Sequence, residues 1–103
     1  MAQKVIAGIS VDVNDEGYMT DRSQWTKEVA KEIAKEEGIE LTDKHYVILD
    51  YLRERQAKGE ALTIRSVGTS GIIDIKGFYG LFPGAPMKKA AKISGIPKPA
   101  SCV

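Results

Sequence analysis

The sequence has little cysteine: Cys102 is the only one among 103 residues. A single cysteine excludes an intramolecular disulfide, and it also excludes a cysteine-rich zinc or iron–sulfur site built by one chain. The lack of disulfides fits a reducing compartment, so we expect a cytoplasmic protein.

Long apolar runs and an excess of one charge are also missing. No stretch approaches the ~20 apolar residues of a membrane span, and the start of the chain is too weakly apolar for a signal peptide. The formal net charge of +1 gives no electrostatic drive toward nucleic acid or an anionic membrane. With 43% apolar and 28% charged residues, we expect one globular domain with a modest core.

Familiar catalytic and nucleotide-binding patterns are absent. The glycines between residues 68 and 80 match neither a P-loop nor a dinucleotide fingerprint, and no Ser-His-Asp set stands out. His45 is the only histidine. It acts either as a base or simply as a surface or half-buried residue, and without an evident partner it predicts no metal site. We expect no cofactor.

The first 20 residues predict a β-hairpin. β-branched residues around Gly8 indicate strands near 4–7 and 9–13, and a turn at Gly17 follows. Because an isolated hairpin is only marginally stable, we expect it to pack on the rest of the chain.

Two amphipathic helices are predicted next. The first runs from a cap at Asp21 or Ser23 to Gly38, and its polar face carries Lys and Glu at i,i+4 spacings that should pair. The second runs from a cap at Thr42 to Gly59. The predicted apolar faces are Trp25, Val29, Ala30, Ile33 and Ala34 in the first helix, and Val47, Ile48, Tyr51 and Leu52 in the second.

Shorter helical pieces are expected between residues 60 and 82, the first of them after Thr63. Pro83 ends this region. A last helix should start at Pro86 and end at Gly95. Residues expected to complete the core are Ile72, Ile73, Ile75, Phe78, Leu81 and Phe82, with Met87, Ala90, Ala91 and Ile93 from the last helix.

The chain closes with "GIPKPASCV". Its two prolines disfavour helix and predict a semi-rigid, extended arm that spans at most about 23 Å from Gly95 to Cys102. Lys98 would favour the reactive thiolate, and the Val103 carboxylate would disfavour it. From the residues alone, a chemical role for Cys102 and an incidental surface cysteine remain equal alternatives.

The segment "YGLFPGAPMKKAAKISGIPKPASCV" resembles the C-terminal signature of the DsrC/TusE family, the gamma subunit of dissimilatory sulfite reductase and its relatives in sulfur relay. The shared pattern is Tyr-x-Leu-Phe-Pro, a Pro-x-Lys run, Gly-x-Pro-Lys-Pro and a penultimate cysteine. The resemblance extends upstream through "DEGYM", "SQW" and "LTDKHYVILDYLRE", with Tyr46 in place of a family tryptophan, and Arg65 falls where the family has an arginine. Nearly the whole chain is covered.

The resemblance implies a mainly α (α+β) fold: a small helical bundle with a helix-turn-helix-like core, an N-terminal β-hairpin and a mobile C-terminal arm. Residues 1–103 would form one domain, divided into a hairpin region (1–20), a helical core (21–95) and the arm (96–103). It further implies that Cys102 holds sulfur as a persulfide, or reaches into a sulfite reductase active site.

Two departures from the family pattern affect the expected role. Relatives that serve sulfite reductase have a second cysteine eleven positions before the penultimate one, where this chain has Ala91. An arm disulfide is therefore impossible, which favours a single-cysteine carrier similar to TusE, passing sulfur toward 2-thiouridine in tRNA. The segment between Arg65 and Lys76 is also shorter than in relatives and lacks most of a basic loop.

We therefore expect a sulfur carrier without an independent catalytic site, at most an acceptor for a sulfurtransferase. Its partners would be sulfurtransferases or sulfur-relay proteins. The alternative is a sulfite reductase partner, and a DNA-binding regulator is less favoured because no basic recognition helix is evident. We expect a monomer, with a thiol-linked dimer as the alternative. Candidate residues for docking the arm or binding an anion are Arg65, Lys76, Lys88 and Lys98.

Overall fold

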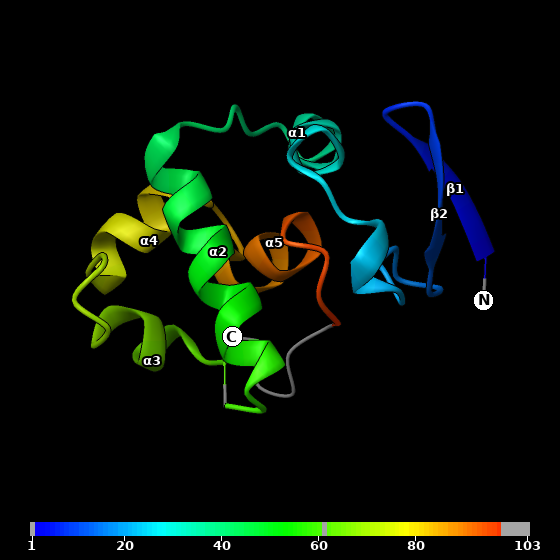
Figure 1. Ribbon diagram of the computed structural model, residues 1–103. Helices are drawn as coiled ribbons and strands as arrows, with labels where there is room; N and C mark the ends of the chain where they lie inside the picture. Colours follow the sequence, from blue (N-terminus) through cyan, green and yellow to red (C-terminus); the bar gives the residue numbers. More distant parts are fainter. Residues whose placement is uncertain (1, 61, 98–103) are drawn as a thin grey trace.

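The computed structural model describes residues 2–60 and 62–97. Over these residues the chain forms an N-terminal β-hairpin, a short 3-10 turn and five α-helices (Figure 1). The predicted mainly helical fold with an N-terminal hairpin is confirmed. The elements are β1 (Ala2–Ile6), β2 (Ile9–Val13), η1 (Arg22–Gln24), α1 (Lys27–Glu36), α2 (Asp43–Ala57), α3 (Ile64–Gly68), α4 (Ile75–Leu81) and α5 (Pro86–Ile93).

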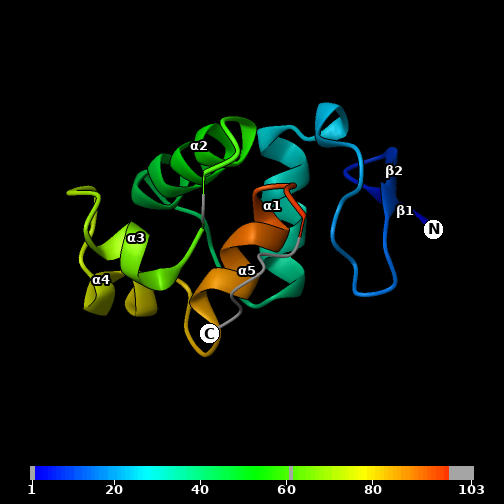
Figure 2. The ribbon, with the colours of Figure 1, turned by 90° about the horizontal axis from the view of Figure 1, so that it is seen from below.

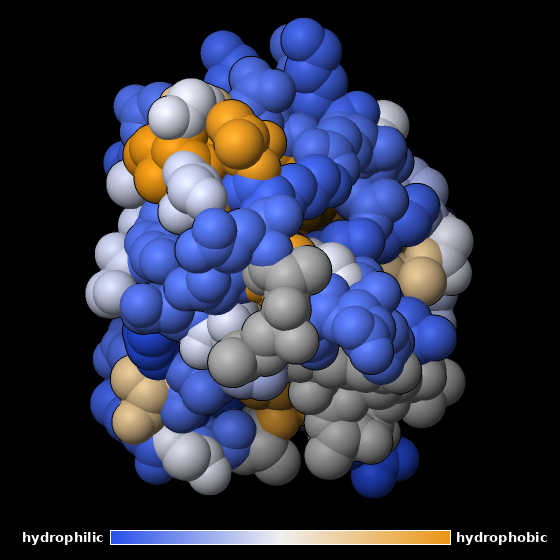
Figure 3. Space-filling model, turned by 90° about the vertical axis from the view of Figure 1, so that its right-hand side faces the viewer, coloured by the Kyte–Doolittle hydropathy of each residue, from blue (hydrophilic) through white to orange (hydrophobic). Residues whose placement is uncertain are grey.

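The hairpin pairs β1 with β2 in antiparallel register. Ala7 and Gly8 connect the strands with φ values of +54° and +76°, as a tight two-residue turn requires. The strands begin and end within two residues of the predicted ranges, 4–7 and 9–13. Val11 is fully buried. Val5, by contrast, is 72% exposed and Ile9 is also exposed, and Figure 3 shows an apolar patch on this otherwise mostly hydrophilic side of the molecule.

The start of the first helix differs from the prediction. Asp21 caps the 3-10 turn η1, where its side chain accepts a hydrogen bond from the Ser23 amide. The helix α1 itself is capped by Thr26. Neither predicted cap is the cap of α1, because Trp25 adopts an extended backbone conformation between the two helical segments. The end of α1 is as predicted, with Gly38 at a φ of +75°.

The prediction that Lys and Glu side chains of the first helix pair with one another is also wrong. In the described residues no ion pair joins two side chains of α1; Glu36 instead pairs with Lys4 of β1, and Glu37 pairs with Lys92 of α5 at 3.5 Å. The reason is a four-residue charge repeat, which places like charges at i,i+4. The lysine stripe is Lys27, Lys31 and Lys35, and the glutamate stripe is Glu28, Glu32 and Glu36.

Helix α2 begins after Thr42 and ends before Gly59, as predicted. Its buried face is shifted relative to the prediction, because Val47 is 51% exposed and Tyr51 is only half-buried. The buried positions follow the i, i+3, i+4, i+7 spacing of one helical face. They are His45, Ile48, Leu49 and Leu52.

The glycine-rich stretch forms the two short helices α3 and α4. Thr63 caps α3, as expected. Phe78 and Phe82 are fully buried and contact each other edge to face, with ring centroids 5.6 Å apart. Ile72 and Ile75 are exposed instead of completing the core, because one lies in the loop before α4 and the other at its first position.

Helix α5 lies at the centre of the bundle, where it packs against α1, α2 and α4. Figure 2 shows the hairpin beyond α1 at one end and α3 with α4 at the other. No helix in the described part of the chain is long and apolar enough to cross a membrane. The largest fully buried side chains are Phe78, Phe82, Met19, Ile48, Leu49, Leu52, Met87, Ile93, Ile96, Val11, Val29 and Val67.

Candidate functional site

The end of α5 leads directly into the C-terminal segment that carries Cys102. The helix ends in a Schellman motif: the Gly95 amide donates to the Lys92 carbonyl, and the Ile96 amide donates to the Ala91 carbonyl, each over 3.3 Å. Ile96 is fully buried. The chain is thus fixed in the core through Ile96, the first residue that the sequence assigned to the arm.

Two side chains hold the last carbonyls of α5. The indole nitrogen of Trp25 donates to the Ile93 carbonyl over 2.8 Å. The Nη1 atom of Arg53 donates to the Ser94 carbonyl, also over 2.8 Å. The Arg53 guanidinium lies 4.3 Å from the centroid of the Trp25 ring, so the two side chains also form a cation–π contact. A cation here complements the negative end of the helix dipole.

Gly95 is required by this arrangement for two reasons. Its φ of +71° lies in the left-handed region, which side chains with a Cβ disfavour. A Cβ at this position would also lie 2.4 Å from the Cδ1 atom of Trp25. The indole therefore packs directly on the glycine backbone. We call Trp25, Arg53 and Gly95 the arm-root clamp.

Arg22 supports the clamp from the 3-10 turn η1. The Nη2 atom of Arg53 donates to the Arg22 carbonyl over 3.2 Å, and the Nη2 atom of Arg22 donates to the Arg53 carbonyl over 3.3 Å. Burial lowers the pKa of Arg53, the neighbouring Arg22 charge lowers it further, and Asp50 partly opposes the shift. A guanidinium nevertheless keeps its charge at neutral pH. The clamp is therefore a cationic site at the root of the arm.

Arg53 was not among the residues expected from the sequence to form a site. The sequence could have indicated it by one feature: Arg53 follows Leu49 by four residues, which places it near the apolar face of α2. Trp25 was predicted only as a core residue. Its hydrogen bond to α5 depends on a contact across 68 positions of the chain, which no local pattern encodes.

The structure does not gather the predicted anion-binding residues into one site. Arg65 lies on α3, Lys76 on α4 and Lys88 on α5, and all three are exposed. No hydrogen bond or ion pair between described residues involves their side chains. Cys102 and Lys98 lie outside the residues that the structure describes.

His45 is neither a surface nor a half-buried residue: it is only 5% exposed. Its Nδ1 atom accepts a hydrogen bond from the Thr42 amide over 3.0 Å, and its Nε2 atom lies 2.8 Å from the Leu81 carbonyl. These partners require the proton on Nε2, so the ring donates to Leu81. With both nitrogens occupied, His45 ties the start of α2 to the end of α4 and is not available as a base.

No metal site is evident in the described part of the chain, where no three His, Cys, Asp or Glu side chains come together. The arm-root clamp can instead position the C-terminal segment. Hydrogen bonds from Trp25 and from Arg53 of α2 converge on the end of α5, and Arg22 of η1 holds Arg53 in place, so the departure point of the arm is defined.

The chain matches a known protein family over almost its whole length. The family model described as DsrC like protein matches residues 5–103. The sulfurtransferase TusE of Buchnera aphidicola subsp. Schizaphis graminum is 36% identical over 101 residues, which cover 90% of this chain and 89% of that protein.

Solved structures agree with this assignment. The DsrC of Allochromatium vinosum is 32% identical, with a TM-score of 0.80 over 98% of this chain and 97% of that one. The oxidised gamma subunit of dissimilatory sulfite reductase (DsrC) from Archaeoglobus fulgidus is also 32% identical, with a TM-score of 0.78 over 99% of this chain and 100% of that one. The chain belongs to the DsrC-like protein family.

Proposed function

We propose that this protein is a sulfur carrier in which Cys102 holds the transferred sulfur as a persulfide. The observation that carries the proposal is the extent of the family match, which runs through residue 103 and so includes the segment around Cys102. The matching protein of Buchnera aphidicola is named a sulfurtransferase, which supports sulfur transfer as the activity.

The chemistry needs only a thiolate and a persulfide donor. The Cys102 thiolate attacks the outer sulfur of the donor persulfide, a new S–S bond forms on Cys102, and the donor leaves as a thiolate. In the second step an acceptor thiolate attacks the outer sulfur of the Cys102 persulfide, and the Cys102 thiolate is released. Each step breaks one S–S bond and forms another, so no external oxidant or reductant is consumed.

The arm-root clamp supports this role by fixing where the arm starts. From Pro97 to Cys102 the chain spans at most about 18 Å when extended. A reactive residue on such a tether samples a limited volume around a fixed point, which raises its effective concentration at a docked partner.

Transfer has to be intermolecular, because Cys102 is the only cysteine. Ala91, at the position where the resemblance places a second cysteine in sulfite reductase partners, is fully buried in the last turn of α5. We therefore place the chain closer to a TusE-like relay than to a two-cysteine redox cycle. The acceptor would belong to tRNA 2-thiolation or to sulfur oxidation.

The second candidate is a sulfite reductase partner that inserts the arm near the active site. It is favoured by the fold shared with the Archaeoglobus fulgidus protein, which is named as the gamma subunit of that enzyme. In either role, the exposed cations Arg65, Lys76 and Lys88, together with Lys98, are proposed to bind an anionic sulfur species or the arm.

Intact-mass measurement tests the carrier function directly. The full chain would be incubated with a persulfide-loaded sulfurtransferase and, separately, with the same sulfurtransferase free of sulfur. We expect a gain of one sulfur atom that is absent in Cys102→Ser and is removed by a thiol reductant. A chain that acquires no sulfur from any persulfide donor would overturn the proposal, and stoichiometric co-purification with sulfite reductase would favour the second candidate.

A further inference from the structure

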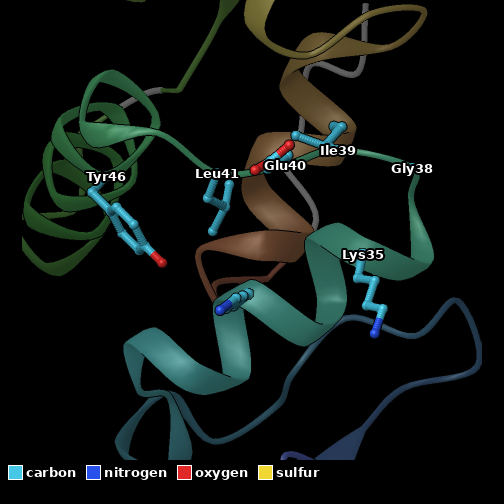
Figure 4. Close-up of a pocket in the computed structure, with 7 residues that line it drawn as sticks. Lys35, Gly38, Ile39, Glu40, Leu41 and Tyr46 are labelled. Carbon is cyan, nitrogen blue, oxygen red and sulfur yellow. The ribbon is translucent and has the colours of Figure 1, made fainter.

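An open pocket lies between α1 and α2, and its lining includes no residue of the arm-root clamp. Its volume is about 570 Å³, and its lining comes from α1, from the loop between the two helices and from α2 (Figure 4). This volume lies within the roughly 300–1,000 Å³ range of ligand pockets. The lining residues are Lys31, Lys35, Gly38, Ile39, Glu40, Leu41 and Tyr46.

The loop and α2 give the pocket an apolar floor. Ile39 is buried, and Leu41 and Tyr46 are half-buried. Figure 4 shows the Leu41 and Tyr46 side chains pointing toward α1 across the pocket. An apolar or aromatic side chain of a ligand could pack on this floor and against the face of the Tyr46 ring, since tyrosine combines an apolar body with a polar tip.

The wall on α1 is cationic. Lys27, Lys31 and Lys35 follow one another at i,i+4 spacing, so they extend over about 12 Å of the helix. No ion pair between described residues involves any of the three. Lys27 does not line the pocket itself, but its Nζ atom lies 5.6 Å from the centroid of the ring of Tyr46, which does.

The lysine stripe is not paired within α1. The repeat places like charges at i,i+4, which destabilises a helix, and it places Glu28 before Lys31 and Glu32 before Lys35 at i,i+3, where opposite charges can pair. No ion pair forms at either spacing among the described residues. At the end of α1, Glu36 pairs with Lys4 of β1, and the following Glu37 pairs with Lys92 of α5. Among the described residues no carboxylate pairs with the stripe, and two of its lysines line the pocket.

We propose that this pocket binds an acidic segment of a partner protein, with one apolar or aromatic side chain on the floor and carboxylates on Lys31 and Lys35. The inference rests on the proposed function, in which donor and acceptor proteins must dock while Cys102 reacts. Glu40 also lines the pocket. Its carboxylate repels an anion from the loop side, and so directs the acidic groups of the segment toward α1.

A short acidic peptide fits this surface better than a nucleic acid does. The glutamate stripe, with Glu28 and Glu32, runs beside the lysine stripe on the same helix, and Glu40 lies in the pocket itself. Nucleic acid binding depends on a continuous positive field that neutralises many phosphates. The chain has a net charge of only +1, so it supplies no such field.

The test is an NMR titration of the ¹⁵N-labelled full chain with a synthetic peptide of four glutamates around a phenylalanine. We expect amide shifts at Gly38, Ile39 and Leu41 and in α1. A peptide of the same charge with glycine in place of phenylalanine should bind at least fivefold more weakly, because it loses the apolar contact. Shifts confined to other surfaces, or equal binding of the two peptides, would overturn the proposal.

Variants separate the lysine stripe from general charge effects. Lys31→Gln with Lys35→Gln should weaken peptide binding about tenfold, as expected for the loss of two exposed contacts of ordinary strength. Glutamine has nearly the helix propensity of lysine, so α1 should remain folded. Lys44→Gln is the matched control, since Lys44 is an exposed lysine on a different face of α2 from Tyr46. An equal loss in the control would refute the assignment.

An oligonucleotide and a thiol variant serve as further controls. A single-stranded oligonucleotide of matched charge should bind more weakly at the same residues, and tighter binding than the peptide would overturn the choice of ligand. Cys102→Ser should bind the peptide normally but acquire no sulfur, while the double lysine variant should acquire sulfur from a small-molecule persulfide normally. Failure of docking and failure of sulfur transfer are thereby distinguished.

Discussion

Replacing Gly95 with alanine should destabilise the protein more than the same replacement at the glycine of an ordinary turn, because it disrupts the arm-root clamp. The substitution places a Cβ 2.4 Å from Cδ1, 2.8 Å from Cγ and 2.9 Å from Cβ of Trp25. Real Cβ atoms do not approach other atoms so closely, so the indole has to move. Movement breaks its hydrogen bond to the Ile93 carbonyl and its stacking on Arg53.

The size of the effect is the sum of three contributions. Alanine at a φ of +71° costs about 1 kcal/mol of folding free energy. Loss of the indole hydrogen bond costs about 1 kcal/mol, and loss of the cation–π contact costs about 0.5–1 kcal/mol. The total is about 3 kcal/mol, which lowers the melting temperature of a domain of this size by about 15 °C.

Thermal unfolding followed by circular dichroism measures this change, and Gly59→Ala is its matched control. Gly59 has a φ of +74°, yet a Cβ added there meets nothing within 4 Å. The control should therefore lose only about 5 °C. Since Trp25 is the only tryptophan, its fluorescence should shift toward that of an exposed indole in Gly95→Ala alone. Equal losses of melting temperature in the two variants, with unchanged fluorescence, would refute the clamp.

Two further predictions concern His45 and Asp21. His45→Ala should lower the free energy of unfolding by about 3 kcal/mol, because it leaves the Thr42 amide and the Leu81 carbonyl without partners. His45→Gln should lower it by about half as much, since glutamine at this position can still accept a hydrogen bond from the cap amide. Equal losses of stability in urea unfolding would contradict this assignment. Hydrogen bonds from the Ser23 side chain and, second, from the Ser23 amide lower the pKa of Asp21 below its ordinary 3.8. The ionised Asp21 carboxylate therefore stabilises the fold above pH 3.8, and this stabilisation is lost as the pH falls through the lower pKa of the folded state. The difference in melting temperature between the parent and Asp21→Asn should shrink below pH 3.8, and a difference that stays constant would argue against the shift.

Local sequence signals located the elements of the fold because each depends on near neighbours. Gly8 closes the hairpin, Thr42 and Thr63 start helices, and Gly38 and Gly95 end them, all through backbone preferences that act within a few residues. The errors arose where two local signals competed. Asp21 is a good cap, but it caps a 3-10 turn because Thr26 offers α1 a second cap one turn later.

Errors in burial have a different origin. Val47 and Ile72 are apolar, and hydrophobicity alone assigned them to the core. Which face of a helix becomes buried is decided by the elements that pack on it, and His45 replaces Val47 on the inner side of α2 because it bonds to α4. A polar residue enters a core when its hydrogen bonds are completed there, and that cannot be read from one segment.

By itself the sequence determined the family, the order of the elements and the candidate reactive residue. The signature around Cys102 and the single thiol are properties of the linear chain, so they required no coordinates. Only the tertiary structure revealed the clamp at the root of the arm and the cationic pocket beside α1. Both join residues from different segments: Trp25 bonds to Ile93 at the end of α5, and Lys31 and Tyr46 line one pocket from two helices. Such segments come together only when the chain packs.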